Sequence, residues 1–195
     1  MQQSISAVIP AAGNSTRMGG DKALLSIREG VTFAGHLVNC FGAYGCKPVI
    51  LVVNEKFDNL RFQSEKVITV VNHTLEKGRS WSVLLGLKQV PAGSACFIQN
   101  VDNPFLDPLL LDRLIESVPH DGYAVPVYQG QGGHPILLGT KAVDFFRRMA
   151  ELPDFREVLQ QMTRTEVDFP DERILWNINT PDDYKQFLHW RNFSL

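Results

Sequence analysis

The stretch that decides the fold runs from residue 7 to residue 22 and reads Ala-Val-Ile-Pro-Ala-Ala-Gly-Asn-Ser-Thr-Arg-Met-Gly-Gly-Asp-Lys. Apolar residues at positions 5 and 7–9 predict a first buried strand, which runs directly into a loop of small residues. Small side chains let backbone N–H groups approach an anion closely, and glycines permit the backbone conformations of such a turn. Arg17 and Lys22 add two positive charges. Amide donors combined with cations are what a triphosphate requires.

The spacing of this loop matches neither of two common phosphate-binding motifs. The Gly-Lys-Ser/Thr triplet of the P-loop is missing, and so is the Gly-x-Gly-x-x-Gly turn of dinucleotide-binding proteins. By spacing alone, an ordinary glycine-rich connection between a strand and a helix fits equally well.

The complete string resembles the signature Ala-Ala-Gly-x-Ser-x-Arg-Met-Gly-x-x-Lys of nucleotidyltransferases that activate a phosphorylated acceptor with a nucleoside triphosphate. It is most similar to the MobA-like group, and within it to the molybdenum cofactor cytidylyltransferases. The resemblance implies that residues 11–15 bind the nucleotide, and that Lys22 and Arg17 neutralise phosphate charge. The nucleotide-binding residues expected in this loop are Ala11, Ala12, Gly13, Asn14 and Ser15.

The composition is that of a globular protein of one domain. The chain has 195 residues, of which 44% are hydrophobic and 21% charged, and we expect residues 1–195 to form a single nucleotidyltransferase domain. A net charge of −2 gives no general attraction to nucleic acid or to an anionic membrane, so anion binding must be local. No apolar run approaches the ~18 residues of a membrane span. Three cysteines without a Cys-x-x-Cys pair or a signal peptide indicate a reducing cytoplasm.

Strands and helices alternate at short spacing as far as residue 118, which predicts βαβ units in a three-layer α/β fold. The resemblance implies a mixed, mostly parallel sheet of the nucleotide-diphospho-sugar transferase type. The apolar patterns predict strands over 49–53, 67–71 and 95–101, with helices over 31–44, 80–90 and from 108. Further on, they predict two extended segments within 123–138 forming a hairpin or an antiparallel edge, helices over 140–150 and 153–162, one or two strands within 165–177, and a last helix capped by Thr180.

The residues after the 67–71 strand resemble the base-recognition stretch of the cytidylyltransferases. The matching positions are Gly78, Arg79, Ser82, Val83, Gly86 and Leu87. The resemblance implies that Gly78, Arg79 and Ser82 contact the nucleobase. The residues alone also fit a plain helix start capped by Ser80, with Trp81, Leu84, Leu85 and Leu87 as the inner face. Both interpretations can hold, because the start of a helix offers free N–H donors.

Asp102 follows the apolar 95–101 strand, and ligands of open α/β sheets bind beyond the carboxyl ends of the strands. Mg²⁺ prefers oxygen ligands, usually one or two carboxylates together with substrate phosphates. Asp102 is therefore a predicted Mg²⁺ ligand, and the family resemblance supports this role. The alternative is an Asx-turn formed by Asp102 and Asn103. Asn103 is not a second acid, and the Asp-x-Asp signature of sugar transferases is absent.

Two later stretches also resemble the family. Gly133-His134-Pro135 matches a Gly-His-Pro motif, which implies that His134 faces the acceptor. Residues 177–183 match a closing Asp-Ile-Asp-Thr-Pro-Glu-Asp, although asparagines occupy both leading positions, 177 and 179. The resemblance implies Asn179 as the second metal ligand, through its carbonyl oxygen. The family also has a glycine-rich Gly-Asp-x-Gly-x-Arg motif, of which this sequence contains only Asp154 and Arg156.

Together these features predict nucleotidyl transfer, in which an acceptor phosphate attacks the α-phosphorus of a nucleoside triphosphate and pyrophosphate leaves. The resemblance favours CTP as donor and a phosphorylated small molecule such as molybdopterin as acceptor, with neither nucleic acid nor membrane as partner. An ionised phosphate needs no general base, so the protein contributes positioning and charge stabilisation. Lys22, Arg17 and Asp102 with Mg²⁺ are the expected catalytic groups. The alternatives are a sugar- or alditol-phosphate nucleotidyltransferase and a non-catalytic nucleotide-binding relative.

Overall fold

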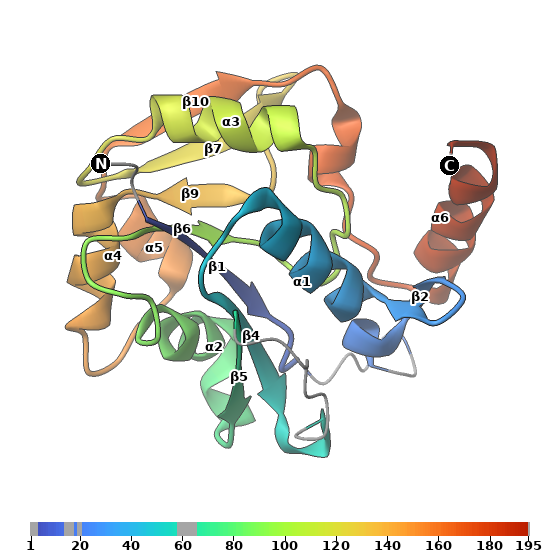
Figure 1. Ribbon diagram of the computed structural model, residues 1–195, viewed down its shortest axis with the longest axis horizontal. Coiled ribbons are helices and arrows are strands. Elements are labelled where there is room, and N and C mark those ends of the chain that lie inside the picture. Colours follow the sequence, from blue (N-terminus) through green and yellow to red (C-terminus); the bar gives the residue numbers. More distant parts are fainter. Residues whose placement is uncertain (1–3, 14–17, 19–20, 58–65, 195) are drawn as a thin grey trace.

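The computed structural model describes residues 4–13, 18, 21–57 and 66–194. An eight-stranded sheet forms its centre, in the order β10-β7-β9-β6-β1-β4-β5, with β8 paired to β7 (Figure 1). A short hairpin of β2 (Ser26–Arg28) and β3 (Val31–Thr32) pairs separately. The strands of the main sheet are β1 (Ile5–Pro10), β4 (Val49–Asn54), β5 (Val67–Asn72), β6 (Ala95–Ile98), β7 (Tyr123–Tyr128), β8 (Gln131–Gly132), β9 (Ile136–Leu138) and β10 (Arg164–Asp168).

The order of the strands explains where a ligand can bind. Strands β5, β4, β1 and β6 run parallel, β9 runs antiparallel to both β6 and β7, and β10 runs parallel to β7. The chain proceeds from β1 outward to β4 and β5, and then returns to the other side of β1 as β6. This reversal opens a crevice at the carboxyl ends of β1 and β6. The predicted mixed, mostly parallel sheet is confirmed.

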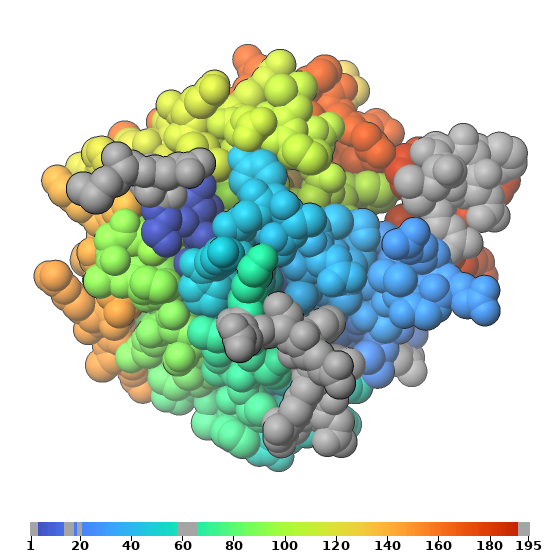
Figure 2. Space-filling view, viewed as in Figure 1, coloured from blue at the N-terminus to red at the C-terminus, as the bar shows by residue number. Residues whose placement is uncertain are grey.

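Helices cover both faces of the sheet, and a hydrophobic cluster lies under each layer. Side chains alternate across a strand, so Leu51 packs in the cluster that includes α1 residues while Ile50 and Val52 pack in the cluster that includes α2 residues. Figure 2 views the first of these faces, with α1 in blue below α3 in yellow-green. The helices are α1 (Phe33–Tyr44), α2 (Gly78–Leu87), α3 (Pro108–Ser117), α4 (Thr140–Arg147), α5 (Phe155–Leu159) and α6 (Pro181–Ser194), joined by the short 3₁₀ helices η2 (Lys22–Leu24), η3 (Glu55–Phe57), η4 (Leu75–Lys77) and η5 (Glu172–Leu175).

The C-terminal helix α6 joins the α1 layer through aromatic contacts. The Phe187 ring lies edge-on to Phe33, with centroids 5.3 Å apart, and the Tyr184 hydroxyl donates to the Ser26 carbonyl at 2.8 Å. In Figure 1, α6 accordingly lies beside the β2 hairpin. Across the described residues, no helix combines the length and the hydrophobicity needed to cross a membrane.

Several predicted elements differ in their ends or their position. The helix expected over 31–44 begins at Phe33, because Gly30, with φ +71°, turns a hairpin and Thr32 caps the helix through the Gly35 N–H. The strand expected over 95–101 is shorter and ends at Ile98. The segment 123–138 contains the predicted hairpin, because β8 pairs antiparallel with β7, and β9 lies between β6 and β7 rather than at an edge. Helix α3 begins at Pro108 as predicted, and Asp107 caps it by accepting from the Leu109 N–H.

Helix α2 differs most from its prediction. It begins at Gly78, and the Ser80 hydroxyl does not cap it but accepts a hydrogen bond from the Phe155 N–H at 3.0 Å, which ties α2 to α5. Its buried residues include Val83, Leu84, Gly86 and Leu87, whereas Trp81 and Leu85 are only half-buried. A β-carbon built on Gly86 would lie 2.4 Å from Val8 Cγ1 and 3.2 Å from Val52 Cγ2. The helix is thus rotated so that its glycine lies closest to the sheet.

Gly86→Ala should therefore destabilise the protein. Overpacking a well-filled core costs about 1–3 kcal/mol, so we expect the melting temperature to fall by roughly 2–12 °C. Gly42→Ala on α1 is the matched control, because a β-carbon there meets nothing within 4 Å. Removing a helical glycine at an open position should raise stability by up to about 1 kcal/mol. Equal melting temperatures for the two variants would contradict the close packing of α2 on β1.

Candidate functional site

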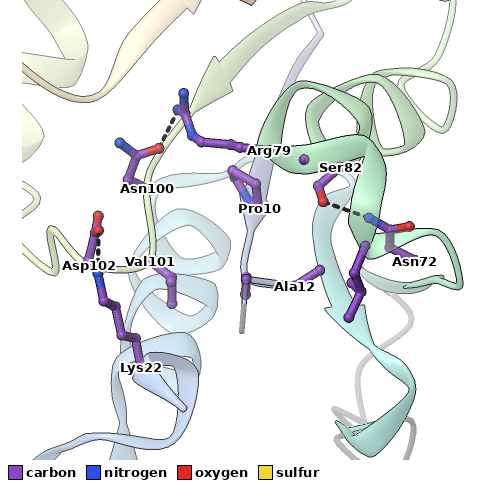
Figure 3. A pocket seen from close by; sticks show the side chains of 13 residues that line it. Pro10, Ala12, Lys22, Asn72, Arg79, Ser82, Asn100, Val101 and Asp102 are labelled. Atoms are coloured by element: carbon purple, nitrogen blue, oxygen red, sulfur yellow. Dashed lines mark hydrogen bonds and ion pairs between the residues drawn. The ribbon is translucent and has the colours of Figure 1, made fainter. Parts of the chain in front are cut away.

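The candidate site is a cavity of about 300 Å³ in the crevice beside the carboxyl end of β1. In the close view of Figure 3, Pro10 and Ala12 lie in the middle, Lys22 and Asp102 on one side, and Asn72 and Ser82 on the other. The cavity is lined by Pro10, Ala11, Ala12, Gly13, Lys22, Asn72, Leu75, Gly78, Arg79, Ser82, Asn100, Val101 and Asp102. The predicted residues Asn14, Ser15 and Arg17 lie outside the described part of the chain.

Lys22 brings three distant segments together. Its Nζ donates to Asp102 Oδ2 at 3.0 Å and to Asn179 Oδ1 at 2.5 Å. The side chains of Lys22 and Asp102 are only 12% and 21% exposed, so solvent screens this ion pair incompletely. Of the four residues expected to act in catalysis or metal binding, Asp102 and Asn179 thus both contact Lys22, and Arg17 lies outside the described residues.

A carboxylate that sequence analysis missed positions Lys22. Asp21 caps η2 by accepting from the Ala23 N–H at 2.9 Å, and its other oxygen accepts from Asn54 Nδ2 at 3.3 Å. Asn54 is buried at the end of β4. Burial raises the pKa of the Asp21 carboxyl, while these two hydrogen bonds oppose the rise. An aspartate immediately before a short helix is a capping signal, which is the feature that would have identified it.

The strand β10 and the 3₁₀ helix η5 occupy the stretch where one or two strands were expected. Asn179 in the closing segment follows η5 and does not end a strand. Instead, the Asp183 carboxylate accepts from the N–H groups of Asn179 and Thr180, both at 2.8 Å, while Thr180 Oγ1 accepts from the Asp183 N–H. The predicted Thr180 cap is thus confirmed as half of a reciprocal capping pair. These hydrogen bonds lower the pKa of Asp183. Asn177 is exposed, and its amide donates to the Leu175 carbonyl.

Asn103 holds the closing segment against β6. It is fully buried, and its Nδ2 donates to the carbonyls of Ile174 at 2.9 Å and Arg173 at 3.2 Å. Its Oδ1 accepts from the Phe105 N–H, so Asn103 forms the Asx-turn considered above while the Asp102 carboxylate faces Lys22. The Ile178 N–H donates to the Asp102 carbonyl at 2.8 Å. Asn103 and Asp102 therefore fix the segment at η5 and at Ile178, directly before Asn179.

On the opposite side of the cavity, two buried polar side chains are paired. Asn72 Nδ2 donates to the Ser82 hydroxyl at 2.9 Å, and Asn72 Oδ1 accepts from the Thr74 N–H. Ser82 is one of the residues predicted from the sequence to contact the nucleotide, whereas Asn72 is not. Ala11 lines the cavity as predicted, but its N–H continues the parallel ladder by donating to the Val52 carbonyl at 2.8 Å. Ala11 therefore contributes a small side chain rather than a free amide.

A second cavity, of about 370 Å³, adjoins the first and shares Arg79, Asn100 and Asp102 with it. His134 lies here, together with Arg156. Burial is the main cause that lowers the pKa of His134, to about 4, and the positive charge of Arg79 adds to it. Asp102 and the Ile98 carbonyl act in the opposite direction. His134 is consequently neutral near pH 7, and the arginines supply the positive charge of this cavity.

The oxygens at the junction of the two cavities suit a hard divalent cation. Asp102 Oδ2 and Asn179 Oδ1 both point at one cationic centre, which is Lys22 Nζ in this structure. Among the described residues, no group of three or more His, Cys, Asp or Glu side chains could hold a metal ion. One carboxylate and one amide oxygen fit an ion that completes its coordination with phosphate oxygens and water.

The comparisons with known proteins agree with this geometry. The MobA-like NTP transferase domain matches residues 7–167. The chain is 28% identical to the molybdenum cofactor cytidylyltransferase of Escherichia coli over 183 residues, which cover 92% of this chain and 93% of that protein. It is 30% identical to the molybdenum cofactor guanylyltransferase of Mesorhizobium japonicum over 203 residues, which cover 95% of each.

Among solved structures, a Mycobacterium tuberculosis protein in complex with manganese superimposes with a TM-score of 0.75. It is 20% identical, and the superposition covers 97% of this chain and 100% of that one. The fold is the nucleotide-diphospho-sugar transferase type found in solved nucleotidyltransferases. The sequence match over most of the chain and the shared fold lead to one conclusion: the chain belongs to the MobA-like NTP transferase family.

Proposed function

We propose that this protein transfers a nucleoside monophosphate, with CMP favoured, from a nucleoside triphosphate to the phosphate of a small acceptor such as molybdopterin. A bond forms between an acceptor phosphate oxygen and the α-phosphorus, the bond from the α-phosphorus to the bridging oxygen breaks, and pyrophosphate leaves. The observation that carries this proposal is the contact of Lys22 with Asp102 and Asn179 where two cavities meet. Charged groups at that junction can act on a phosphate held between the two ligands.

We assign the first cavity to the nucleotide. Residues 11–15 with Arg17 and Lys22 would hold the triphosphate, while Gly78, Arg79 and Ser82 would contact the base. The arrangement in Figure 3 supports this division, because Ser82 lies across the end of β1 from Lys22. The resemblance at residues 78–87 favours cytosine, although the relatives include both cytidylyl- and guanylyltransferases.

We assign the metal site to Asp102 and Asn179, with Mg²⁺ as the ion. When bound, a divalent ion neutralises triphosphate charge and makes the α-phosphorus more electrophilic. The manganese complex of the structural neighbour supports a divalent ion in this fold. Lys22 would then exchange its contacts with Asp102 and Asn179 for contacts with phosphate oxygens. The second cavity, with His134, would take the acceptor.

We also propose that residues 1–195 act as one domain in the cytoplasm. The family match ends at residue 167, yet α6 beyond it packs on α1 through Phe187. Cys40, Cys46 and Cys96 are free thiols, which suits a reducing compartment.

A screen of pyrophosphate release tests the proposed reaction. CTP, GTP, ATP and UTP would each be incubated with Mg²⁺ and with molybdopterin, sugar phosphates or alditol phosphates. We expect release that requires both a nucleotide and an acceptor, and that is fastest with molybdopterin. Release with a sugar or alditol phosphate alone would assign the acceptor to the alternative class. Nucleotide binding without release under every condition would contradict the enzyme and support a binding protein.

Thermal stabilisation tests the base preference separately. A ligand that binds only the native state at 100 times its Kd stabilises it by about 2.7 kcal/mol. We expect CTP to raise the melting temperature more than GTP does at equal concentration and fixed Mg²⁺. Inorganic tripolyphosphate is the control that reports the contribution of the phosphates without a base. A larger shift with GTP would reverse the assignment to a guanylyltransferase.

A further inference from the structure

A chain of hydrogen bonds connects the two cavities through Asn100. Arg79 donates to Asn100 Oδ1, and Asn100 Nδ2 lies 2.8 Å from His134 Nε2. Figure 3 shows the first of these bonds, with Arg79 reaching from α2 to Asn100 over the end of β1. Asn100 and Arg79 line both cavities, whereas His134 lines only the second. The family resemblance gave no role to Asn100.

The chemistry of the three side chains fixes the direction of each bond. A guanidinium only donates, so the Asn100 amide must present its oxygen to Arg79 and its NH₂ group to His134. An amide NH₂ also only donates, so His134 Nε2 must accept and cannot carry a proton. A neutral imidazole whose Nε2 is unprotonated carries its proton on Nδ1. Arg79 therefore determines the tautomer of His134 through Asn100.

The same hydrogen bonds also orient Arg79, starting from His134. The Asn100 side chain has two rotatable bonds, and the acceptor at His134 Nε2 holds its amide in one orientation. The amide oxygen then holds one N–H of Arg79, and a guanidinium has further N–H groups for a phosphate. Burial lowers the pKa of Arg79, and the negative charge of Asp102 at the same junction opposes this by stabilising the charged guanidinium.

We propose that Asn100 is a positioning residue: its NH₂ group holds His134 as the neutral Nδ1-protonated tautomer, and its amide oxygen orients Arg79 at the junction of the two cavities. This inference deepens the proposed function, on which its catalytic consequence rests. Asn100 itself need not touch a substrate. The neutral His134 ring supports the amide, and the positive charge offered to a phosphate comes from Arg79.

The ring nitrogens of His134 in the ligand-free protein provide the first test. Long-range ¹H–¹⁵N NMR spectra distinguish protonated from unprotonated imidazole nitrogens, and His134→Gln assigns the signal among the five histidines. We expect a proton on Nδ1 and none on Nε2 in the wild-type protein. A wild-type His134 protonated on Nε2 would overturn the proposal, and this measurement needs neither a variant at Asn100 nor any substrate.

The variant Asn100→Asp tests the bond to His134, because it replaces the hydrogen-bond donor at residue 100 with an acceptor. An aspartate accepts from Arg79 as before but cannot donate to His134, so the imidazole proton should move to Nε2. Asn177→Asp is the matched control, because it places the same charge in the same cavity while Asn177 donates to Leu175 rather than to His134. We expect the control to keep the wild-type tautomer. An unchanged tautomer in Asn100→Asp would contradict the proposal.

Kinetics test the consequence for Arg79. Asn100→Leu, close in size, removes both hydrogen bonds, and we expect kcat/KM for the acceptor to fall about tenfold or more, as for the loss of a hydrogen bond to a charged group. For Asn100→Asp, which keeps the contact with Arg79, kcat/KM for the acceptor should fall less. An equal loss in both variants would contradict orientation of Arg79 by residue 100. If the wild-type tautomer is as expected but no nucleotide and acceptor release pyrophosphate, the proposed function fails and the hydrogen-bonded chain stands.

Discussion

Asp102→Ala will reduce pyrophosphate release by about 10³-fold or more, the upper end of what one preorganised electrostatic group contributes. The variant removes the carboxylate proposed to hold Mg²⁺, and it also leaves Lys22 without the oxygen that lies 3.0 Å from its Nζ. Both changes act at the junction of the two cavities. Single-turnover measurements of pyrophosphate release at saturating CTP and acceptor would isolate the chemical step.

The closing segment provides the graded comparison. Asn179→Ala should cost less than Asp102→Ala, because it removes a neutral ligand, and Asn179→Asp should be tolerated and tighten the metal. A site with one carboxylate binds Mg²⁺ weakly, so calorimetry should detect little binding without nucleotide and clear binding with it. Asp182→Ala controls for loss of a carboxylate as such, since Asp182 is 82% exposed and pairs with Lys185 on α6. Metal-dependent turnover in Asp102→Ala would mean that the metal site is built elsewhere.

Lys22→Ala will slow turnover by about 10²-fold or more, as expected for the loss of a charged group that is held in place before the reaction. Lys22 starts η2, and Asp21 fixes that turn to the end of β4. Holding the Lys22 ammonium group in place therefore costs little free energy. Without Lys22, the Asp102 carboxylate also loses its ion-pair partner. The loss should therefore appear mainly in kcat.

Lys56→Ala is the matched control for Lys22. Lys56 is an exposed lysine on η3, directly after the same strand β4, and its charge acts on Asp21 from outside the cavity. We expect its turnover to stay within about threefold of the wild type, because an exposed charge is screened by solvent. Near-normal turnover in a folded Lys22→Ala variant would exclude Lys22 from phosphate binding.

The elements that sequence patterns predicted best are those that local chemistry determines. Strand β4 is a continuous apolar run from Val49 to Val53 in which every residue but Leu51 is β-branched, and it is buried along its whole length, as expected for a central parallel strand. Asp107 before Pro108 begins α3 by capping, and Thr180 before Pro181 does the same for α6. Each of these features depends on residues that are close neighbours in the sequence.

The buried asparagines show why the rest could not be predicted. Asn103 bonds to Ile174, which is 71 residues away, and Asn54 bonds to Asp21, which is 33 residues away. Nothing next to Asn103 in the sequence indicates these partners, because η5 lies near Asn103 only through the pairing of β6 with β9 and of β9 with β7. The family resemblance implied that Asp102 and Asn179 bind one metal ion, but neither it nor any local pattern predicted their contacts with Lys22.

The attachment of the closing segment has a consequence for shortened versions of this protein. A chain that stopped after Pro170 would retain every strand of the main sheet. It would lack Asn179 and Thr180, and the buried amide of Asn103 would lose the carbonyls of Arg173 and Ile174. The truncation would also remove the core side chains Ile174, Ile178 and Phe187, so it would weaken the protein at the base of its site. The sheet is therefore complete at Asp168, whereas the site also needs the residues that lead to Asn179.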